Sequence, residues 1–147
     1  MKFKIIAVGK KMPEWVTDTY QEYAKRFFNN YHVELIEITA KNDMEKEGEL
    51  IMSKIELTDY VIALDEHGKM LTSKALSESL QRWHDENLTV AILIGGADGL
   101  ANSCKQRANM MLSFSAFTLP HPLVRIVLVE QLYRAMTIIN NHPYHRE

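Results

Sequence analysis

Four short apolar runs, separated by segments with helical spacing, constrain the fold of this chain more than any other feature. The runs are rich in branched residues, are too short for helices, and span residues 3–8, 33–38, 60–64 and 88–94. They predict strands, and the apolar residues three or four positions apart between them predict amphipathic helices. A short segment and a long final helix follow the fourth strand.

Strands that alternate with helices are forced into a mostly parallel sheet, because each helix returns the chain to the end where the strand began. The unbroken apolar run from Val90 to Ile94 agrees, since both faces of such a sheet are covered by helices. At 147 residues the chain is long enough to bury one real core. We therefore expect one α/β domain, residues 1–147, with helices on both faces of the sheet.

The predicted helices have recognisable starts. Asn42 with Glu45 resembles a capping box for the second helix, and Thr72 or Ser73 can cap the third. Pro122 suits the first position of the final helix, which we extend to about residue 140. The residue before a proline is pushed out of the helical region, so we place His121 at the cap with its ring at the edge of a loop.

Ligands of parallel sheets bind outside the carboxyl ends of the strands, which points to three loops. They span residues 65–68, 95–99 and 114–122. In the second loop, Gly95, Gly96 and Gly99 let a ligand approach the backbone, although a plain turn needs no ligand. Their order matches neither the dinucleotide fingerprint nor the P-loop. These classes of nucleotide site are therefore not expected.

Polar and aromatic groups concentrate in the last 29 residues, where a chain end would normally fray. The final helix carries His121 at its start and a Glu130/Arg134 pair on its polar edge, and Pro143 ends it. Its apolar stripe is wide, so either core packing or a second subunit could cover it. We expect no metal site, because Pro143 between His142 and His145 breaks the helical geometry that a metal-binding pair would need.

Charge and cysteine usage narrow the class of protein. A net charge of −2 argues against non-specific binding of nucleic acid by the whole surface, although lysines and arginines crowd the first fifth and could form a basic face. The single Cys104 is expected to be a core residue. The absence of cysteine pairs, of a signal-peptide pattern and of a membrane-length apolar run favours a cytoplasmic protein without membrane contact.

Four motifs carry a resemblance that extends over essentially the whole chain: residues 94–100 (IGGADGL), 119–125 (LPHPLVR), 130–134 (EQLYR) and 141–146 (NHPYHR). With them the chain resembles the RlmH family of SPOUT methyltransferases, which use S-adenosylmethionine to methylate N3 of a pseudouridine in 23S ribosomal RNA. The resemblance implies a trefoil knot in the carboxyl-terminal half. It also implies a homodimer that acts on ribosomal RNA or the ribosome, with the cofactor pocket at the knot.

The family's cofactor contacts fall on the three loops already selected by sheet geometry. They correspond to Leu64, Gly95, Phe114, Ser115, Ala116, Phe117, Thr118 and Leu119. We hypothesise that His121 lies beside the transferred methyl group. We assign a second group of residues to holding the target nucleotide and to easing the loss of its N3 proton. The group consists of Arg125, Tyr144, His145 and Arg146. The last three form a tail that belongs either to the same subunit or to its partner.

Two rival functions remain open at this point. A non-catalytic RNA- or ribosome-binding module on the same fold would need a basic face but no cofactor, so calorimetry with S-adenosylmethionine distinguishes it. A different α/β nucleotide-binding enzyme, such as a flavin enzyme, would show itself in the absorbance of the purified protein.

Overall fold

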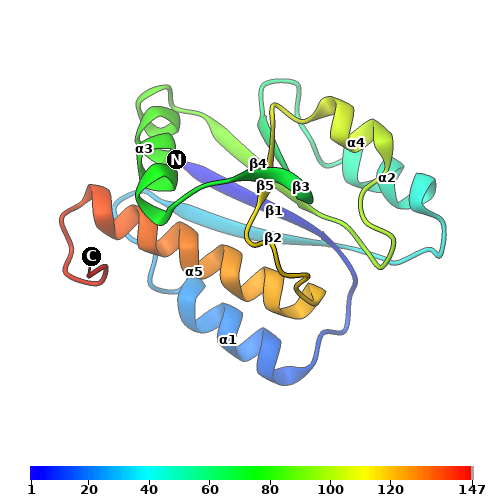
Figure 1. Cartoon of the computed structure of the whole chain (residues 1–147), viewed down its shortest axis with the longest axis horizontal. Coiled ribbons are helices and arrows are strands. Elements are labelled where there is room, and N and C mark those ends of the chain that lie inside the picture. The colour runs from blue at the N-terminus through cyan, green and yellow to red at the C-terminus, as the bar shows by residue number, and fades with distance from the viewer. Residues whose placement is uncertain (147) are drawn as a thin grey trace.

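The computed structural model describes residues 1–146 and contains a five-stranded sheet in the order β2-β1-β4-β3-β5 (Figure 1). All paired strands run parallel, as predicted. The strands are β1 (Lys2–Val8), β2 (His32–Ile38), β3 (Tyr60–Met70), β4 (Thr89–Ile94) and β5 (Met110–Ser113). The helices are α1 (Glu14–Ala24), α2 (Met44–Met52), α3 (Ser73–Asp85), α4 (Asn102–Arg107) and α5 (His121–Ile139).

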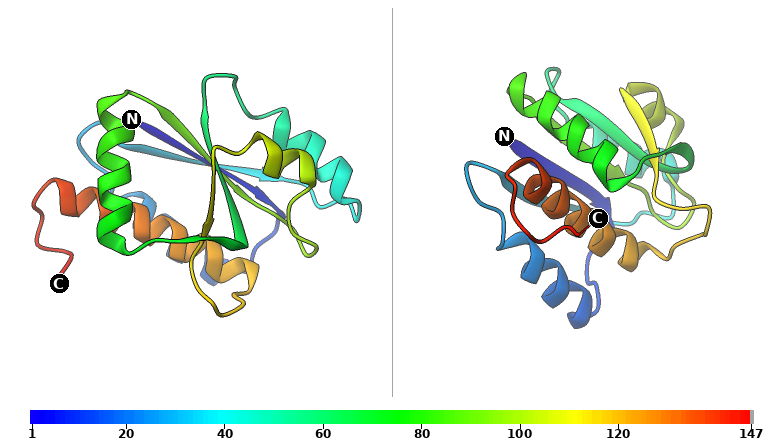
Figure 2. Two further views of the ribbon diagram at one scale, coloured as in Figure 1. Left: turned by 45° about the horizontal axis from the view of Figure 1, so that its top comes forward. Right: turned by 60° about the vertical axis from the view of Figure 1, so that its left-hand side comes forward.

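Helices cover both faces of the sheet, which confirms that part of the predicted architecture (Figure 2). Alternate residues of β1 point to opposite faces, so Phe3 and Ile5 join a core with α1, α3 and α5, whereas Ile6 and Val8 join a core with α2 and α4. Side by side, α1 and α5 form the lower layer in Figure 1, and α2 lies near α4 on the opposite side of the sheet.

The sequence-based prediction missed one strand and misjudged the end of another. The four residues of β5 are too few to show a strand pattern, and they pair with β3 at the edge of the sheet. Residues 65–68, predicted as a loop after the third strand, form an irregularity inside β3. Leu112 of β5 is the partner of both Leu64 and Lys69, so the intervening residues bulge away from the ladder.

Two predicted helix starts need correction by one residue. Asp43, not Asn42, caps α2, because its carboxylate accepts the backbone N–H groups of Glu45 and Lys46. The final helix begins at His121 rather than at Pro122, and Pro120 occupies the cap position. The third start is confirmed, since the Thr72 hydroxyl accepts the N–H of Ala75.

Much of the suspected basic face is engaged in ion pairs. Lys2 pairs with Glu34, and Lys25 and Arg26 both pair with Glu22. Lys4 is buried, so it does not contribute to a basic face. No helix within residues 1–146 has the length and apolar character needed to cross a membrane.

We predict that Asp59→Ala destabilises the fold strongly. Lys4 Nζ lies 2.5 Å from Asp59 Oδ2, and both side chains are more than nine-tenths buried. Removal of the carboxylate leaves an uncompensated buried ammonium, which costs about 3–5 kcal/mol. Urea denaturation measures the loss, and Glu34→Ala, which breaks the exposed pair with Lys2, is the control. A loss no larger than that of the control would contradict the prediction.

Candidate active site

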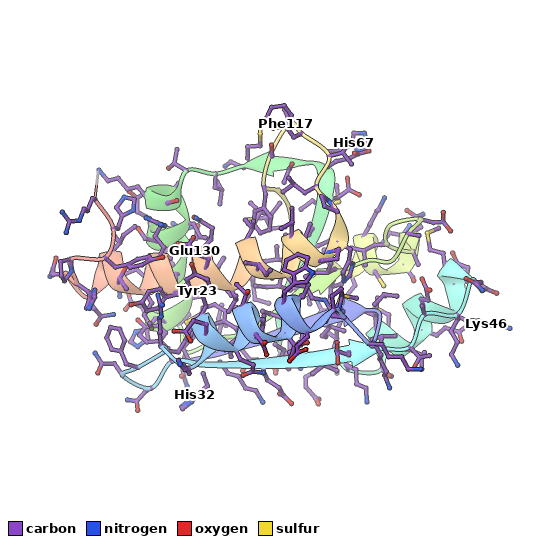
Figure 3. All side chains as sticks on the ribbon, turned by 90° about the horizontal axis from the view of Figure 1, so that it is seen from below. Tyr23, His32, Lys46, His67, Phe117 and Glu130 are labelled. Atoms are coloured by element: carbon purple, nitrogen blue, oxygen red, sulfur yellow. The ribbon has the colours of Figure 1, made fainter. Side chains whose placement is uncertain are left out.

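A cleft of about 600 Å³ opens at the carboxyl edge of the sheet. Three segments line it, together with Lys105 and Val124: Leu64 to His67 at the irregularity within β3, the turn from Ile94 to Gly99, and residues 112–121 from the end of β5 onward, except Ala116. Figure 3 shows His67 and Phe117 from two of these segments near each other at one edge of the molecule. The three loops selected by sheet geometry therefore meet in a single cavity, with a volume in the range of ligand pockets.

The glycine turn is too tight for side chains at its base. A Cβ on Gly95 would lie 2.4 Å from the Gly99 carbonyl carbon and 2.7 Å from the Leu100 nitrogen. The Gly99 N–H donates to the Gly96 carbonyl at 3.0 Å, and Gly99 itself has φ +85°, which favours glycine. The first glycine is thus required by a close backbone approach, and the last by its conformation.

The segment after β5 is shaped by its own hydroxyl groups. Ser113 Oγ donates to the Ser115 carbonyl at 3.0 Å, and Ser115 Oγ accepts the Phe117 N–H at 2.9 Å. These bonds turn the Phe117 ring outward, where it is 82% exposed. Of the eight residues assigned to cofactor contact, seven line the cleft, and the exposed Ala116 does not.

Two of the charged residues that line the cleft form an ion pair that was not predicted. Asp65 accepts the His67 backbone N–H at 2.8 Å and pairs with Lys105 Nζ at 3.1 Å. The backbone bond from His67, with a smaller contribution from Lys105, holds the pKa of the Asp65 carboxyl below its usual range. The cleft therefore contains a persistent anion. Asp65 belonged to a selected loop, but Lys105 comes from α4, which no sequence pattern linked to the site.

His121 sits on the wall of the cleft with both ring nitrogens engaged. Its Nδ1 lies 3.0 Å from the Gly95 carbonyl oxygen, and its Nε2 accepts a hydrogen bond from Arg125 Nε at 2.9 Å. Burial, and then the neighbouring Arg125 charge, lower the pKa of the His121 ring, although the Gly95 bond opposes them. The ring is therefore neutral at pH 7.

We predict that His121 titrates below pH 6.5 in the folded protein. The unfolded state then binds the extra proton first, so the contribution of His121 to stability is complete above pH 6.5 and decreases as the pH falls below it. An NMR titration of the ring Cε1–H signal, assigned with His121→Asn, measures this value. A titration above pH 6.5 would contradict the burial of the ring beside the Arg125 charge.

Arg125 is 1% exposed and does not line the cleft. Its guanidinium points into the protein, where Glu37 and the Gly9 carbonyl accept its remaining bonds. A side chain buried to this degree is out of reach of an RNA, so the hypothesised grip of Arg125 on the target nucleotide finds no support in this arrangement.

The sequence profile described as "Predicted SPOUT methyltransferase" matches residues 1–145. The chain belongs to the SPOUT methyltransferase family. It is also 46% identical, over 156 residues covering all of both chains, to the "Ribosomal RNA large subunit methyltransferase H" of Hahella chejuensis (strain KCTC 2396).

Two solved structures resemble this SPOUT methyltransferase in fold. A probable methylase family protein from Haemophilus influenzae Rd KW20 aligns with 99% of this chain and 70% of its own, with a TM-score of 0.60 and 9% identity. A putative methylase family protein from Neisseria gonorrhoeae aligns with 99% and 86%, respectively, with a TM-score of 0.59 and 14% identity. At such low identity these likenesses establish the fold alone.

The tail of this SPOUT chain folds back on the far half of α5. Tyr144 donates its hydroxyl to Glu130 Oε2 at 2.8 Å, and the Arg134 guanidinium lies over the Tyr144 ring at 4.8 Å and contacts His145 Nδ1 at 3.1 Å. Burial, with the Glu130 bond, raises the pKa of Tyr144. The tail is thus held in place, although a chain end would normally fray.

Within one subunit, Tyr144, His145 and Arg146 are not brought together with the cleft. His121 and Glu130 are nine positions apart in α5, which corresponds to about 14 Å along the axis. In Figure 3, Glu130 and Tyr23 lie left of centre, apart from Phe117 and His67 at the top of the view.

The described residues contain no cluster of three or more histidine, cysteine or carboxylate side chains able to hold a metal ion. Cys104 is completely buried in the core beneath α2 and α4, as predicted, and burial raises the pKa of its thiol. It is not a nucleophile of the cleft, since it does not line it.

Proposed function

We propose that this chain is an S-adenosylmethionine-dependent methyltransferase that methylates N3 of a pseudouridine in 23S ribosomal RNA, acting on the ribosome as a homodimer. The observation that carries the proposal is the meeting of three loops in one cleft at the carboxyl edge of the sheet. The full-length relative named as a ribosomal RNA large subunit methyltransferase supports the RNA substrate. Cytoplasmic location stays a prediction.

The cleft fits the cofactor chemically. The Gly95 position, which a Cβ would fill with a clash, lets backbone groups approach a ligand closely, and the Asp65 carboxylate can accept hydrogen bonds from ribose hydroxyls. Apolar groups for the adenine ring and the methionine chain come from Leu64, Phe114 and Leu119. S-adenosylmethionine supplies an already activated methyl group, so the protein must mainly align the acceptor and exclude water.

The trefoil knot is part of this proposal. Residues 65–68 form a loop next to β5, because Leu112 of β5 pairs with the β3 residues that precede and follow this loop. A Cβ on Gly68 would lie 2.7 Å from the Leu112 backbone, so the two segments are in close contact. A chain that passes through this loop before entering α5 would be knotted. Threaded chains are rare, which is why the fold rules alone argue against one.

The homodimer is supported by apolar groups beside the cleft. Trp15 at the start of α1 is 52% exposed, Leu123 near the start of α5 is 39% exposed, and Phe117 extends from the cleft mouth. These two helices pack against each other, so Trp15 and Leu123 lie at the same end of one layer (Figure 1). A second copy that covers this end would remove the apolar groups from water.

In such a dimer, the tail of one subunit reaches the cleft of the other. Glu130 and Arg134 fix Tyr144 and His145 about three helical turns from their own cleft, so a partner is needed to bring them to the methyl group. The imide N3 carries a proton that must pass to water or another base as N3 forms its bond to the methyl group. Cationic donors from the tail, including Arg146, would stabilise the anion that forms. His121 is neutral and hydrogen-bonded through both ring nitrogens, so it stabilises the wall of the cleft.

Methylation of ribosomes tests the proposal. With methyl-labelled S-adenosylmethionine, we expect transfer to the large ribosomal subunit and little transfer to free RNA, because the net charge of −2 gives weak affinity for naked RNA. Mapping of the modified base should identify N3 of a pseudouridine, and ribosomes from cells that lack the pseudouridine are the control. Absence of transfer to any ribosomal particle would contradict the function.

A further inference from the structure

A buried hydrogen-bonded chain runs behind the cleft from β2 to the glycine turn. At its centre, Arg125 Nη1 donates to Glu37 Oε2 at 2.7 Å, Nη2 donates to the Gly9 carbonyl at 2.7 Å, and Nε donates to His121 Nε2 at 2.9 Å. His121 Nδ1 continues the chain to the Gly95 carbonyl. A buried guanidinium is costly unless it is paired, and here each of its three edges has a partner.

We infer that Glu37 and Arg125 are positioning residues of the methyltransferase, which fix His121 in one tautomer and, through it, hold the glycine turn in the shape that binds the cofactor. This inference rests on the proposed function. Glu37 lies on β2 and does not line the cleft, so it acts through Arg125 and His121 and does not touch substrate or cofactor.

The tautomer follows from the group that faces each ring nitrogen, a donor on one side and an acceptor on the other. Arginine Nε is always a donor, so His121 Nε2 must present its lone pair to it. A carbonyl oxygen is always an acceptor, so Nδ1 must carry the proton that it donates to Gly95. The ring is therefore a neutral bridge, and its orientation depends on the position of the Arg125 guanidinium.

Glu37 sets the position of that guanidinium. Among residues 1–146, it is the only carboxylate in ion-pair contact with Arg125. The Tyr20 hydroxyl is the one buried side-chain oxygen of the described residues without a hydrogen-bond partner, so it does not hold the guanidinium either. The Glu37 side chain is 35% exposed, compared with 2% for Arg125, so Glu37 can be replaced with less damage to packing.

The glycine turn is the end of the chain that meets the ligand. Gly95 lies in the tight approach to Gly99 and lines the cleft, and its carbonyl is held from behind by the His121 ring. If the ring rotates away, the carbonyl loses its donor. The turn then gains freedom that cofactor binding must remove.

The test combines the state of His121 with cofactor affinity in the full-length protein. In the wild type, ¹⁵N NMR should show a His121 ring with its proton on Nδ1. In Glu37→Ala, we expect a mixture of tautomers and an affinity for S-adenosylmethionine, measured by calorimetry, that is about tenfold lower. Glu37→Gln keeps the size and one acceptor oxygen, so it should give a smaller loss, and it replaces the alanine variant if that variant does not fold.

Glu34→Ala is the matched control, because Glu34 lies on the same strand but pairs with Lys2 on the exposed surface. It should change neither the His121 tautomer nor the affinity. Wild-type tautomer or wild-type affinity in both Glu37 variants would overturn the inference. A wild-type protein that does not bind S-adenosylmethionine would instead refute the proposed function, and the NMR signal would still report whether Glu37 controls His121.

Discussion

Gly95→Ala is expected to weaken S-adenosylmethionine binding by about 10- to 100-fold. The added methyl group would lie 2.4 Å from the Gly99 backbone, so the turn must open or shift. Overpacking of this kind costs about 1–3 kcal/mol, which corresponds to about one to two decades in affinity if the strain falls on the binding conformation. Calorimetry measures the affinity, and methylation of ribosomes should fall with it.

A matched control separates this effect from a general loss of stability. Gly48 lies in α2, where an added Cβ would be 2.7 Å from Ala101 Cβ. This contact belongs to the core under α2 and α4, on the opposite face of the sheet from α5. Gly48→Ala should therefore reduce the thermal midpoint but leave the affinity unchanged. If Gly95→Ala and Gly48→Ala lose stability equally and both bind the cofactor as the wild type does, the glycine turn is not part of the cofactor site.

Removal of residues 144–147 is expected to reduce methylation by about 10²- to 10³-fold, the loss typical of removing a donor that stabilises developing charge. Cofactor affinity should stay near the wild-type value, because none of the described tail residues lines the cleft. Single-turnover assays with ribosomes measure the rate, and calorimetry measures the affinity. Full methylation by the truncated protein would remove the tail from the mechanism.

Subunit mixing determines whether the tail acts within its own subunit or on the partner. A truncated subunit keeps an intact cleft, and a Gly95→Ala subunit keeps an intact tail. Random mixing in a 1:1 ratio gives about half heterodimers, each with one complete site if the tail acts across the dimer. Activity should then return to about a quarter of the wild-type level. A mixture as inactive as its components would show that the tail serves its own cleft.

The strands and the position of the cleft were predictable because their signals are local. The branched apolar runs of β1, β2 and β4 are visible in the sequence, and parallel strands place the following loops at one edge. The glycine turn was selected for the same reason. Strand β5 was missed because four residues carry no period, and its place beside β3 depends on long-range pairing.

The supporting residues of the site could not be predicted. Glu37 and Arg125 are 88 positions apart in the chain, and nothing in either segment indicates that the two side chains meet. Lys105 reaches Asp65 from α4, which packs on the opposite face of the sheet from α5. In contrast, His121 was identified because it stands between two prolines at the start of a helix. Its role could not be read from that position, since its two partners come from distant segments.

The most direct test of the central claim is a crystal of the protein soaked with S-adenosylhomocysteine, the product of methyl transfer. We predict density for the ligand in the cleft, in contact with Leu64, Gly95 and Leu119, and with its sulfur facing Tyr144 of a second subunit. Density for the ligand at another place on the protein, with these three loops empty, would contradict the account.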